Sequence, residues 1–524
     1  MAERKPAPKP TFVLDGRIVC CDANDEVIED GRVVIAAGRI AALLRKGQPR
    51  PSAYAKAVEV DTAGTIYPGL IDLHNHFVYN SLPLWAPPKT YQNRTQWARE
   101  GAYATNVALP VRALAAYETT AKALVRYVEA KALAGGTTTG QGIRTRVNGG
   151  LSLFRGAMRN VEQSDDPQLP NAGTRVPNLY PNPANVLEFR GRLDALQAYF
   201  YHLAEGTDTH ARETYLDLTE NHLVRASLVG IHCLGLAAAD LVAYGNQKAK
   251  VIWSPFSNLL LYGRTLHLSE LAASKAVFAL GSDWSPTGSK NLLHELKVAS
   301  WEAHRQGATL SDRDLVHALT SAPAQILGWA GHLGSIQPGF LADLIVVAPG
   351  GEPFSELVRA RERQIALVVV GGEARYGAPA LMNKLHSRHS GLESATVDGS
   401  ARYFAFDEPS ASLGGLPLAE AQSRLSEAME DLPRFRERAE EGRARLSAIG
   451  IENEPFTVEL DNEYSADPGD PDAPAVLMAD WSQIADHVDL DPFPVDEPGY
   501  WKQLHAQKNL DPALIRTLEQ AYAH

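Results

Sequence analysis

The feature that most constrains the fold is an alternation of apolar, strand-like runs with helical stretches between residues 66 and 329. The stretches between the runs, such as NVALPVRALAAYETTAKALVRYVEAKALAG, carry apolar residues at the three- and four-residue spacing typical of helices. Repeated strand–helix units predict a parallel (β/α)8 barrel, or TIM barrel, with its functional groups at the carboxyl ends of the strands. The strand candidates are TIYPGLIDLH, GGTTTGQG, LSLFRGAMRN, QAYFYHLAE, SLVGIHC, KVIWSP and AVFALGSD.

Seven strands can be recognised in this way, and the fourth of the eight is expected between Glu162 and Asp194, hidden in a segment rich in Pro and Asn. Two strand-rich blocks flank the barrel region, with turn signals such as Asp-Gly and Ala-Gly that predict hairpins. We therefore expect an α/β chain in which a small β-sandwich domain is built from both flanks. The expected division is residues 1–65 and 333–378 for the β-domain, 66–332 for the barrel, and 379–524 for a C-terminal appendage.

Charge is distributed unevenly along the chain. The formal net charge of the 524 residues is -12, yet the residues from Gly391 onward include 27 acidic and 10 basic side chains. This acidic balance argues against nucleic acid or an anionic membrane surface as a partner. Residues 417–450 form one helical candidate with an exposed, ion-paired face, and the aromatic residues of the tail predict that it packs on the barrel.

The three cysteines, Cys20, Cys21 and Cys233, are too few for a disulfide framework. No secretory signal and no apolar run of about 20 residues is visible in the sequence. We therefore expect a cytoplasmic protein with a small-molecule substrate, and leave open a homo-oligomer such as a dimer.

Ionisable side chains end four of the predicted strands. His74 and His76 end the first strand and, being two residues apart, point to the same side of it. His202 and Glu205 close AYFYHLAE, His232 closes SLVGIHC, and Asp283 closes AVFALGSD. Each one taken alone fits a surface histidine, a polar strand end or a helix cap. Together, in this order, they predict convergent metal ligands, because buried ionisable groups are costly unless they are paired or bound to metal.

These motifs resemble the amidohydrolase superfamily, and within it the deaminase-like branch that includes cytosine deaminase, adenosine-type deaminases and triazine hydrolases. The resemblance covers residues 11–376 and leaves the tail unexplained. It is carried by PGLIDLHNH (68–76), GGTTT (135–139), HLAE (202–205), GIHC (230–233), SPFSN (254–258), GSD (281–283) and LGSIQPGFLADLIVV (333–347).

The resemblance implies one divalent metal ion, Zn²⁺ first and Fe²⁺ as the alternative. Its ligands would be His74, His76, His202 and Asp283. The implied catalytic residues are Glu205 as proton shuttle, His232 beside the water or substrate, and Asp283 as proton acceptor. A metal-bound hydroxide would attack an sp² carbon. Binuclear relatives use a carboxylated lysine, and no lysine occurs between Lys131 and Lys248, so a single metal is expected.

The substrate is less constrained than the chemistry. Asp283 is followed by WSPTGSKN, and His76 leads into a Pro-rich loop, where the sequence departs from many deaminases of this branch. Candidate substrate residues are Asn80, Trp85, Asn258 and Trp284, although Trp85 and Trp284 equally suit packing within a folded loop. We expect a deaminase of a heteroaromatic or amidine-like substrate. The alternatives are hydrolysis of an amide, urea or carbamate by the same centre, and a non-catalytic binding scaffold.

Overall fold

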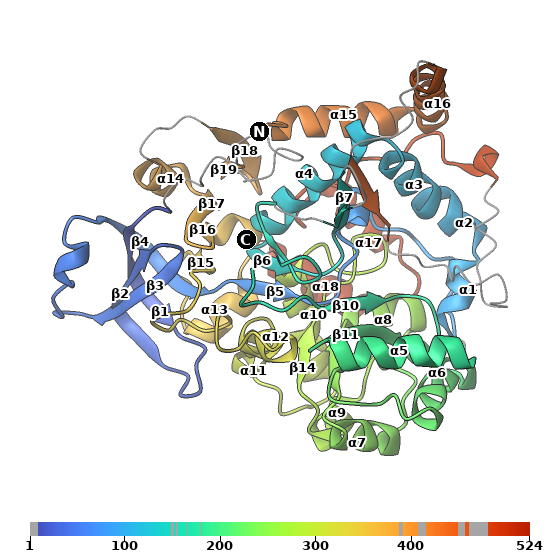
Figure 1. Cartoon of the computed structure of the whole chain (residues 1–524), viewed down its shortest axis with the longest axis horizontal. Helices are drawn as coiled ribbons and strands as arrows, with labels where there is room; N and C mark the ends of the chain where they lie inside the picture. Colours follow the sequence, from blue (N-terminus) through green and yellow to red (C-terminus); the bar gives the residue numbers. More distant parts are fainter. Residues whose placement is uncertain are drawn as a thin grey trace.

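The computed structural model describes residues 9–147, 151–152, 156–164, 166–179, 181–386, 391–406, 415–448, 456–460 and 480–523. Its architecture is α/β, with a large sheet at one end of the molecule and parallel strands surrounded by helices at the other (Figure 1). Within these residues, no helix combines the length and the apolar character needed to cross a bilayer.

The large sheet has nine strands drawn from both flanks of the chain, in the order β18-β19-β17-β16-β15-β4-β1-β2-β3. The two flanks meet where β4 pairs antiparallel with β15, from Thr65 opposite Val347 to Pro68 opposite Leu344. The strands are β1 (Phe12–Val19), β2 (Val27–Ala36), β3 (Arg39–Arg45), β4 (Val58–Pro68), β15 (Leu344–Val347), β16 (Ile365–Val370), β17 (Glu373–Gly377), β18 (Leu392–Val397) and β19 (Ser400–Ala405).

Both kinds of dipeptide turn signal mark a turn in this sheet, but not at every occurrence. Ala37-Gly38 connects β2 to β3 and Asp398-Gly399 connects β18 to β19, each with positive φ at both residues, as a two-residue hairpin loop requires. The other two Asp-Gly pairs instead lie inside β1 and β2, where Gly16 pairs with Gly31. A Cβ on Gly31 would lie 2.5 Å from Cδ1 of Ile18, so this glycine serves close packing of the sheet.

Eight short parallel strands form two groups, β5-β6-β9 and β10-β11-β12-β13-β14. The groups meet where Ala172 N donates to Val161 O at 2.8 Å, and again where Asp283 N donates to His74 O at 2.8 Å. The strands are β5 (Leu70–Asp72), β6 (Thr137–Gly140), β9 (Arg159–Asn160), β10 (Gly173–Arg175), β11 (Tyr199–Leu203), β12 (Leu228–His232), β13 (Lys250–Trp253) and β14 (Phe278–Leu280).

A strand does occur in the Pro- and Asn-rich segment, as expected, but β10 spans only Gly173–Arg175. It has no apolar run, which explains why hydrophobic periodicity could not locate it. By contrast, β11 and β12 are buried along their whole length, as is typical of parallel strands covered on both faces.

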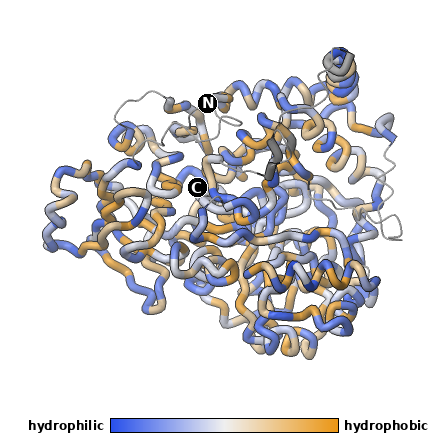
Figure 2. Tube along the Cα trace, in the orientation of Figure 1, coloured by the Kyte–Doolittle hydropathy of each residue, from blue (hydrophilic) through white to orange (hydrophobic). Residues whose placement is uncertain are grey.

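Helices cover the parallel strands, and along α5 hydrophobic and hydrophilic residues alternate as on a helix with one buried face (Figure 2). Those of the strand–helix region are α1 (Arg94–Ala98), α2 (Gly101–Tyr103), α3 (Leu109–Ala115), α4 (Glu118–Ala134), α5 (Pro183–Ala195), α6 (Thr209–Glu220), α7 (Ala238–Asn246), α8 (Pro255–Tyr262), α9 (Leu268–Ser274), α10 (Leu292–Arg305), α11 (Asp312–His317) and α12 (Ser321–Leu327). The later helices are α13 (Pro353–Arg359), α14 (Pro379–Leu385), α15 (Leu418–Glu430), α16 (Leu432–Ala448), α17 (Pro498–His505) and α18 (Pro512–Tyr522). Strands β7 (Arg144–Val147), β8 (Leu151–Ser152) and β20 (Phe456–Glu459) form a separate small sheet.

The helix expected over residues 417–450 is broken at Asp431 into α15 and α16. Pro433 causes the break, because proline lacks an N–H and its ring clashes with the carbonyl four residues earlier. That carbonyl, Met429 O, instead accepts a hydrogen bond from Val488 N at 3.1 Å. The C-terminal segment therefore docks against the break.

The last part of the chain and the strand–helix region form a hydrophobic cluster together, separate from the main core. From the tail this cluster contains Val495, Tyr500, Leu504, Leu510, Leu514, Ile515, Leu518 and Tyr522, and from the rest of the chain Leu84, Phe256, Leu259, Leu260 and Val298. The tail is thus packed on the helices that follow β13 and β14, as its aromatic residues predicted.

We expect Leu514→Ala to lower the free energy of unfolding by about 2–5 kcal/mol, because the fully buried side chain would leave a cavity in this cluster. Denaturant unfolding of the full chain measures the change. Leu187→Ala, at an exposed position of α5, is the matched control and should have little effect.

Candidate metal centre

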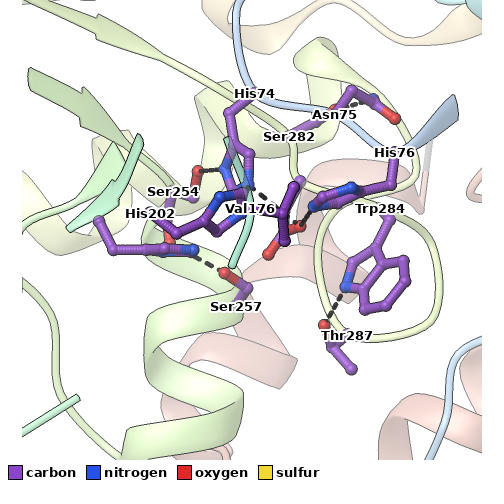
Figure 3. Close-up of polar contacts among 12 residues, drawn as sticks. His74, Asn75, His76, Val176, His202, Ser254, Ser257, Ser282, Trp284 and Thr287 are labelled. Carbon is purple, nitrogen blue, oxygen red and sulfur yellow. Dashed lines mark hydrogen bonds and ion pairs between the residues drawn. The ribbon is translucent and has the colours of Figure 1, made fainter. Parts of the chain in front are cut away.

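Four side chains converge at the carboxyl ends of β5, β11 and β14. The distance from His74 Nε2 to His202 Nε2 is 3.3 Å, and that from His74 Nε2 to Asp283 Oδ1 is 3.4 Å. His76 Nε2 lies 3.7 Å from the same Asp283 oxygen. Figure 3 shows His74, His76 and His202 pointing toward one another. All four side chains are buried.

These distances suit a metal ion. Ligand atoms roughly 2.0–2.1 Å from a tetrahedral ion lie about 3.3–3.4 Å from each other. Two groups, His74–His76–Asp283 and His74–His202–His232, each place their potential ligand atoms within 4.8 Å of one another. Three imidazoles and a carboxylate are also the donor types that zinc and similar ions prefer.

The protonation states of these side chains also suit the binding of a metal ion. Burial, with the neighbouring His232 and His76, lowers the pKa of His74, and burial likewise lowers the pKa of His202. Both imidazoles are therefore neutral near pH 7, with a lone pair free for a metal. Burial raises the pKa of Asp283, partly offset by His76 and His232. A cation at the centre would favour the ionised carboxylate.

The imidazole orientations are set by neighbouring polar groups. Ser254 Oγ lies 2.7 Å from His74 Nδ1, which leaves Nε2 to face the centre. Asn75 Nδ2 donates to Asp72 Oδ2 at 3.0 Å and to Ser282 Oγ at 2.9 Å, so β5 and β14 are joined just outside the ligands. Gly142, with a φ of 100°, lets the chain pass close: a Cβ there would lie 2.0 Å from Asn75 O.

Non-glycine residues at the strand ends adopt left-handed backbone conformations. They are Ala204 (φ 49°), His232 (φ 66°), Cys233 (φ 53°) and Asp283 (φ 62°). Such conformations cost free energy and persist where the surrounding structure enforces them, often at functional sites. Here they turn the chain sharply as it leaves β11, β12 and β14.

His232 and Glu205 lie beside the four converging side chains. His232 Nδ1 lies 2.9 Å from Asn258 Oδ1, and Asn258 Nδ2 donates to Thr265 Oγ1 at 3.0 Å. The amide oxygen thus accepts the Nδ1 proton, and His232 Nε2 faces Glu205 Oε2 at 3.7 Å. Asn258 holds the ring of His232 in this orientation.

Glu205 is anchored through one of its oxygens. Tyr262 donates its hydroxyl proton to Glu205 Oε1 at 2.7 Å, and Trp97 Nε1 donates to Tyr262 OH at 2.9 Å. Among the described residues, the buried Oε2 has no hydrogen-bond partner, and Arg94 Nε is 3.8 Å away from it. Glu205 therefore presents one free carboxylate oxygen toward His232.

Aromatic rings border the centre on the side of His76. The ring of Trp284 lies 5.0 Å from that of His76 and 4.6 Å from that of Tyr79, and its Nε1 donates to Thr287 (Figure 3). Trp85 stands further out, 5.7 Å from the ring of Tyr103, which in turn is 6.2 Å from that of Trp284.

Both polar atoms of the Asn80 side chain form hydrogen bonds with segments around the centre. Its Nδ2 donates to Asn75 Oδ1 at 3.0 Å, and its Oδ1 accepts from Ser285 N at 2.7 Å. Of the four residues expected to contact substrate, Trp284 therefore lies beside a candidate ligand, while Asn80 and Asn258 hold other residues of the site.

Comparisons with known proteins agree with this geometry. Residues 193–375 match the profile of the amidohydrolase family. The 5-methylthioadenosine/S-adenosylhomocysteine deaminase of Symbiobacterium thermophilum is 25% identical over 370 residues, which are 63% of this chain and 84% of that protein. The guanine deaminase of Escherichia coli is 27% identical over 165 residues, 30% of this chain and 38% of that enzyme.

Solved structures resemble the fold. The chain aligns with a zinc-bound adenosine deaminase of Xanthomonas campestris at a TM-score of 0.55 and 20% identity, over 70% of this chain and 94% of that one. For the E. coli guanine deaminase the TM-score is 0.53 at 17% identity, over 70% and 98%. In sequence the chain is thus similar to deaminase-like amidohydrolases, and in fold to solved structures of this kind. This confirms the resemblance carried by its motifs, and with it the prediction of a metal-dependent enzyme that hydrolyses C–N bonds.

Sequence reasoning missed several residues around the candidate metal centre. Asp72 and Asn75 lie inside the PGLIDLHNH motif, and Ser254 opens SPFSN, so the motifs contained them without indicating their roles. Tyr262 and Arg94 carry no local signal, because only the tertiary structure brings them to Glu205.

We expect the purified protein to bind a divalent ion tightly, and a His74→Ala/His76→Ala variant to lose it, since two of the four converging ligand atoms disappear. Elemental analysis of both proteins measures this. His210→Ala, at a partly exposed position of α6, is the control and should retain the metal. Equal metal content in the double variant and the parent would exclude this site.

We also expect one metal equivalent per chain. The Nζ of Lys131, whose side chain would have to be carboxylated to bridge two ions, instead donates to Asn80 O at 2.8 Å and to Ser285 Oγ at 2.9 Å. Metal titration followed by crystallography tests this. Two fully occupied ions about 3.5–4 Å apart would contradict it.

Proposed function

We propose that this amidohydrolase is a deaminase of a small heteroaromatic or amidine-like molecule. Its ligands for one divalent ion, Zn²⁺ before Fe²⁺, are His74, His76, His202 and Asp283. The observation that carries the proposal is the convergence of these buried ligand atoms at tetrahedral separations, with the free oxygen of Glu205 beside them.

An ion held by His74, His76, His202 and Asp283 would lower the pKa of a water molecule and so supply a nucleophile near neutral pH. Asp283 would take up the proton that this water loses as its oxygen bonds to an sp² carbon. His232, held by Asn258, directs Nε2 toward the reacting atoms. Glu205 would pass a proton to the departing nitrogen, so that the C–N bond breaks and ammonia leaves, and the proton taken up by Asp283 would then return to Glu205.

The relatives support deamination over the alternative. Two relatives are named as deaminases, one of 5-methylthioadenosine and S-adenosylhomocysteine and one of guanine. An S-triazine hydrolase of Gordonia rubripertincta also matches. It is 25% identical over 23% of this chain and 26% of that enzyme. Hydrolysis of an amide, urea or carbamate by the same centre is the second candidate. A screen over purines, pyrimidines, pterins and triazines separates the two, because deamination releases ammonia while the alternative yields a free carboxylate or a larger amine.

For the substrate we propose that Trp284 forms a flat wall against which an aromatic ring stacks. Its ring lies beside that of His76, which favours this role over one in the core alone. Trp85, Asn80 and Asn258 remain predicted contributors to substrate binding.

We also infer that the eight parallel strands close into a (β/α)8 barrel over residues 66–332. The hydrogen bonds that join β9 to β10 and β14 to β5 support closure. Residues 1–65 and 333–378 would form the β-sandwich domain and 379–524 the extension, which adds β18 and β19 to the sheet of that domain through the pairing of β19 with β17. Three buried free thiols suit a reducing compartment such as the cytoplasm.

We expect Glu205→Gln to lower kcat by about 10²–10⁴-fold with unchanged metal content and little change in KM, because the amide keeps the shape but carries no transferable proton. Steady-state kinetics on a substrate found by the ammonia screen, together with metal analysis, measures this. Glu213→Gln, an exposed change on α6, is the matched control.

The expectation that Glu205 could merely cap the following helix is wrong, because Asp208 caps α6 and accepts from Ala211 N at 2.8 Å. If Glu205 only accepts the hydrogen bond from Tyr262, the substitution would cost at most about 1–2 kcal/mol of stability and leave turnover nearly intact. Near-normal turnover would therefore remove the deaminase-like mechanism, even if the metal were bound as expected.

A further inference from the structure

We propose that Asp491, a buried carboxylate of the C-terminal extension, is a positioning residue for the metal centre. It acts on two loops: the first ligand loop (residues 77–91), which follows His76, and the last ligand loop (residues 284–291), which follows Asp283. The inference deepens the proposed function and rests on it. Asp491 lies outside residues 11–376, to which the resemblance to the amidohydrolases is confined.

Asp491 forms the centre of a buried charge cluster. Its side chain is 2% exposed, its Oδ2 accepts from Lys131 Nζ, and its Oδ1 lies 3.1 Å from Lys290 Nζ. Both lysine side chains are buried to the same degree, one on α4 and the other in the last ligand loop. Removing one partner from a buried pair leaves an uncompensated charge, which is strongly destabilising locally.

Lys131 connects Asp491 to both ligand loops. Its Nζ donates to Asn80 O of the first ligand loop at 2.8 Å and to Ser285 Oγ of the last ligand loop at 2.9 Å. Asn80 Oδ1 also accepts from Ser285 N at 2.7 Å, which joins the two loops directly. The lysine thus fastens the loops at the point where they meet.

The hydrogen bonds of Asn80 continue to Asn75, which lies between two metal ligands in the chain. Asn80 Nδ2 donates to Asn75 Oδ1 at 3.0 Å, and Asn75 separates His74 from His76 in the chain. On the other loop, Ser285 follows Asp283 by two residues. Asp491 is therefore connected by short polar contacts to both chain segments that supply metal ligands.

The charge of Lys131 depends on Asp491. Burial lowers the pKa of Lys131 to about 8, and Asp491 is the main influence that opposes this shift. Without the carboxylate, burial and Lys290 would both disfavour the charged form of Lys131, opposed mainly by Glu362. The three donors of Lys131 would then no longer be held toward Asn80, Ser285 and position 491.

Further contacts of the extension hold the first ligand loop along its length. Asp491 N donates to Ser81 O at 2.9 Å, Gln507 Nε2 to Trp85 O at 3.1 Å, and Asn509 Nδ2 to Lys89 O at 2.7 Å. The loop is thus attached to the extension at three points, and Asp491 supplies the one nearest the ligands.

Two solved structures align over 94% and 98% of their own length. In both alignments they match only 70% of this chain. Part of this chain is therefore additional to the shared fold. An additional segment that supplies a buried counter-charge to the ligand loops would make the centre of this chain dependent on it.

The test compares Asp491→Asn with Leu514→Ala in the full-length protein. Both changes loosen the extension, but only the first removes the charge in contact with Lys131. At a temperature where both variants are folded, we expect Asp491→Asn to weaken zinc binding by about 10–100-fold, the usual effect of losing a partner outside the ligand shell. Leu514→Ala should lower the melting temperature without changing zinc affinity. Competition with a chelator measures the affinity.

Hydrogen exchange followed by mass spectrometry gives a second readout that needs neither metal nor substrate. We expect Asp491→Asn to speed exchange in both ligand loops, and Leu514→Ala to speed it in α18 and its neighbours. If Asp491→Asn proves too unstable, the triple variant Lys131→Met/Lys290→Met/Asp491→Leu removes all three buried charges together, which often preserves stability. Because the loop contacts of Lys131 are still lost, zinc affinity should remain reduced.

Unchanged zinc affinity and loop exchange in Asp491→Asn, or effects equal to those of Leu514→Ala, would overturn the inference. Failure of the proposed function is seen separately: wild-type protein would release no ammonia from any compound in the screen. In that case loop exchange and zinc affinity still decide the role of Asp491.

Discussion

The removal of ionisable side chains from water is the constraint on which the rest of this structure depends. His74, His76, His202 and Asp283 are buried together, where an isolated charge would be costly. The fold meets this cost by keeping His74 and His202 neutral, and Ser254 supplies a partner to the nitrogen of His74 that faces away from the centre. A divalent ion among the four would complete the compensation, so metal binding and local stability are linked.

The same constraint explains why the backbone is strained around the centre. Parallel strands bring their carboxyl ends to one side of the sheet, but a straight strand end would direct only alternate side chains inward. The left-handed conformations of His232, Cys233 and Asp283 turn the chain at these ends. Asp283 can then hydrogen-bond through its backbone to His74 and His76 while its carboxylate faces the ligands.

A second buried polar cluster lies between the strand–helix region and the C-terminal extension. Lys131 and Lys290 belong to the part of the chain that carries the family motifs, and Asp491 to the acidic tail. The tail is rich in acidic residues. One of them, Asp491, makes a specific buried contact with two lysines, while others lie on the solvated surface. Tyr500 covers one side of the buried cluster, since Lys290 Nζ lies 5.2 Å from the centre of its ring, and burial strengthens the interaction between these charges.

By itself the sequence determined the class of chemistry and the residues that approach one another, because each ionisable group ends an apolar run and parallel strands align such ends. This reasoning placed His74, His76, His202, His232 and Asp283, which the structure brings together. It could not place β10, which has no apolar run, or foresee that Gly16 and Gly31 serve packing within strands. Nor could it connect Lys131 with Asp491, or Tyr262 with Glu205. Those pairs are far apart in the chain, and no local pattern encodes them. Only the packing of helices and tail around the strands decides which buried charge meets which partner.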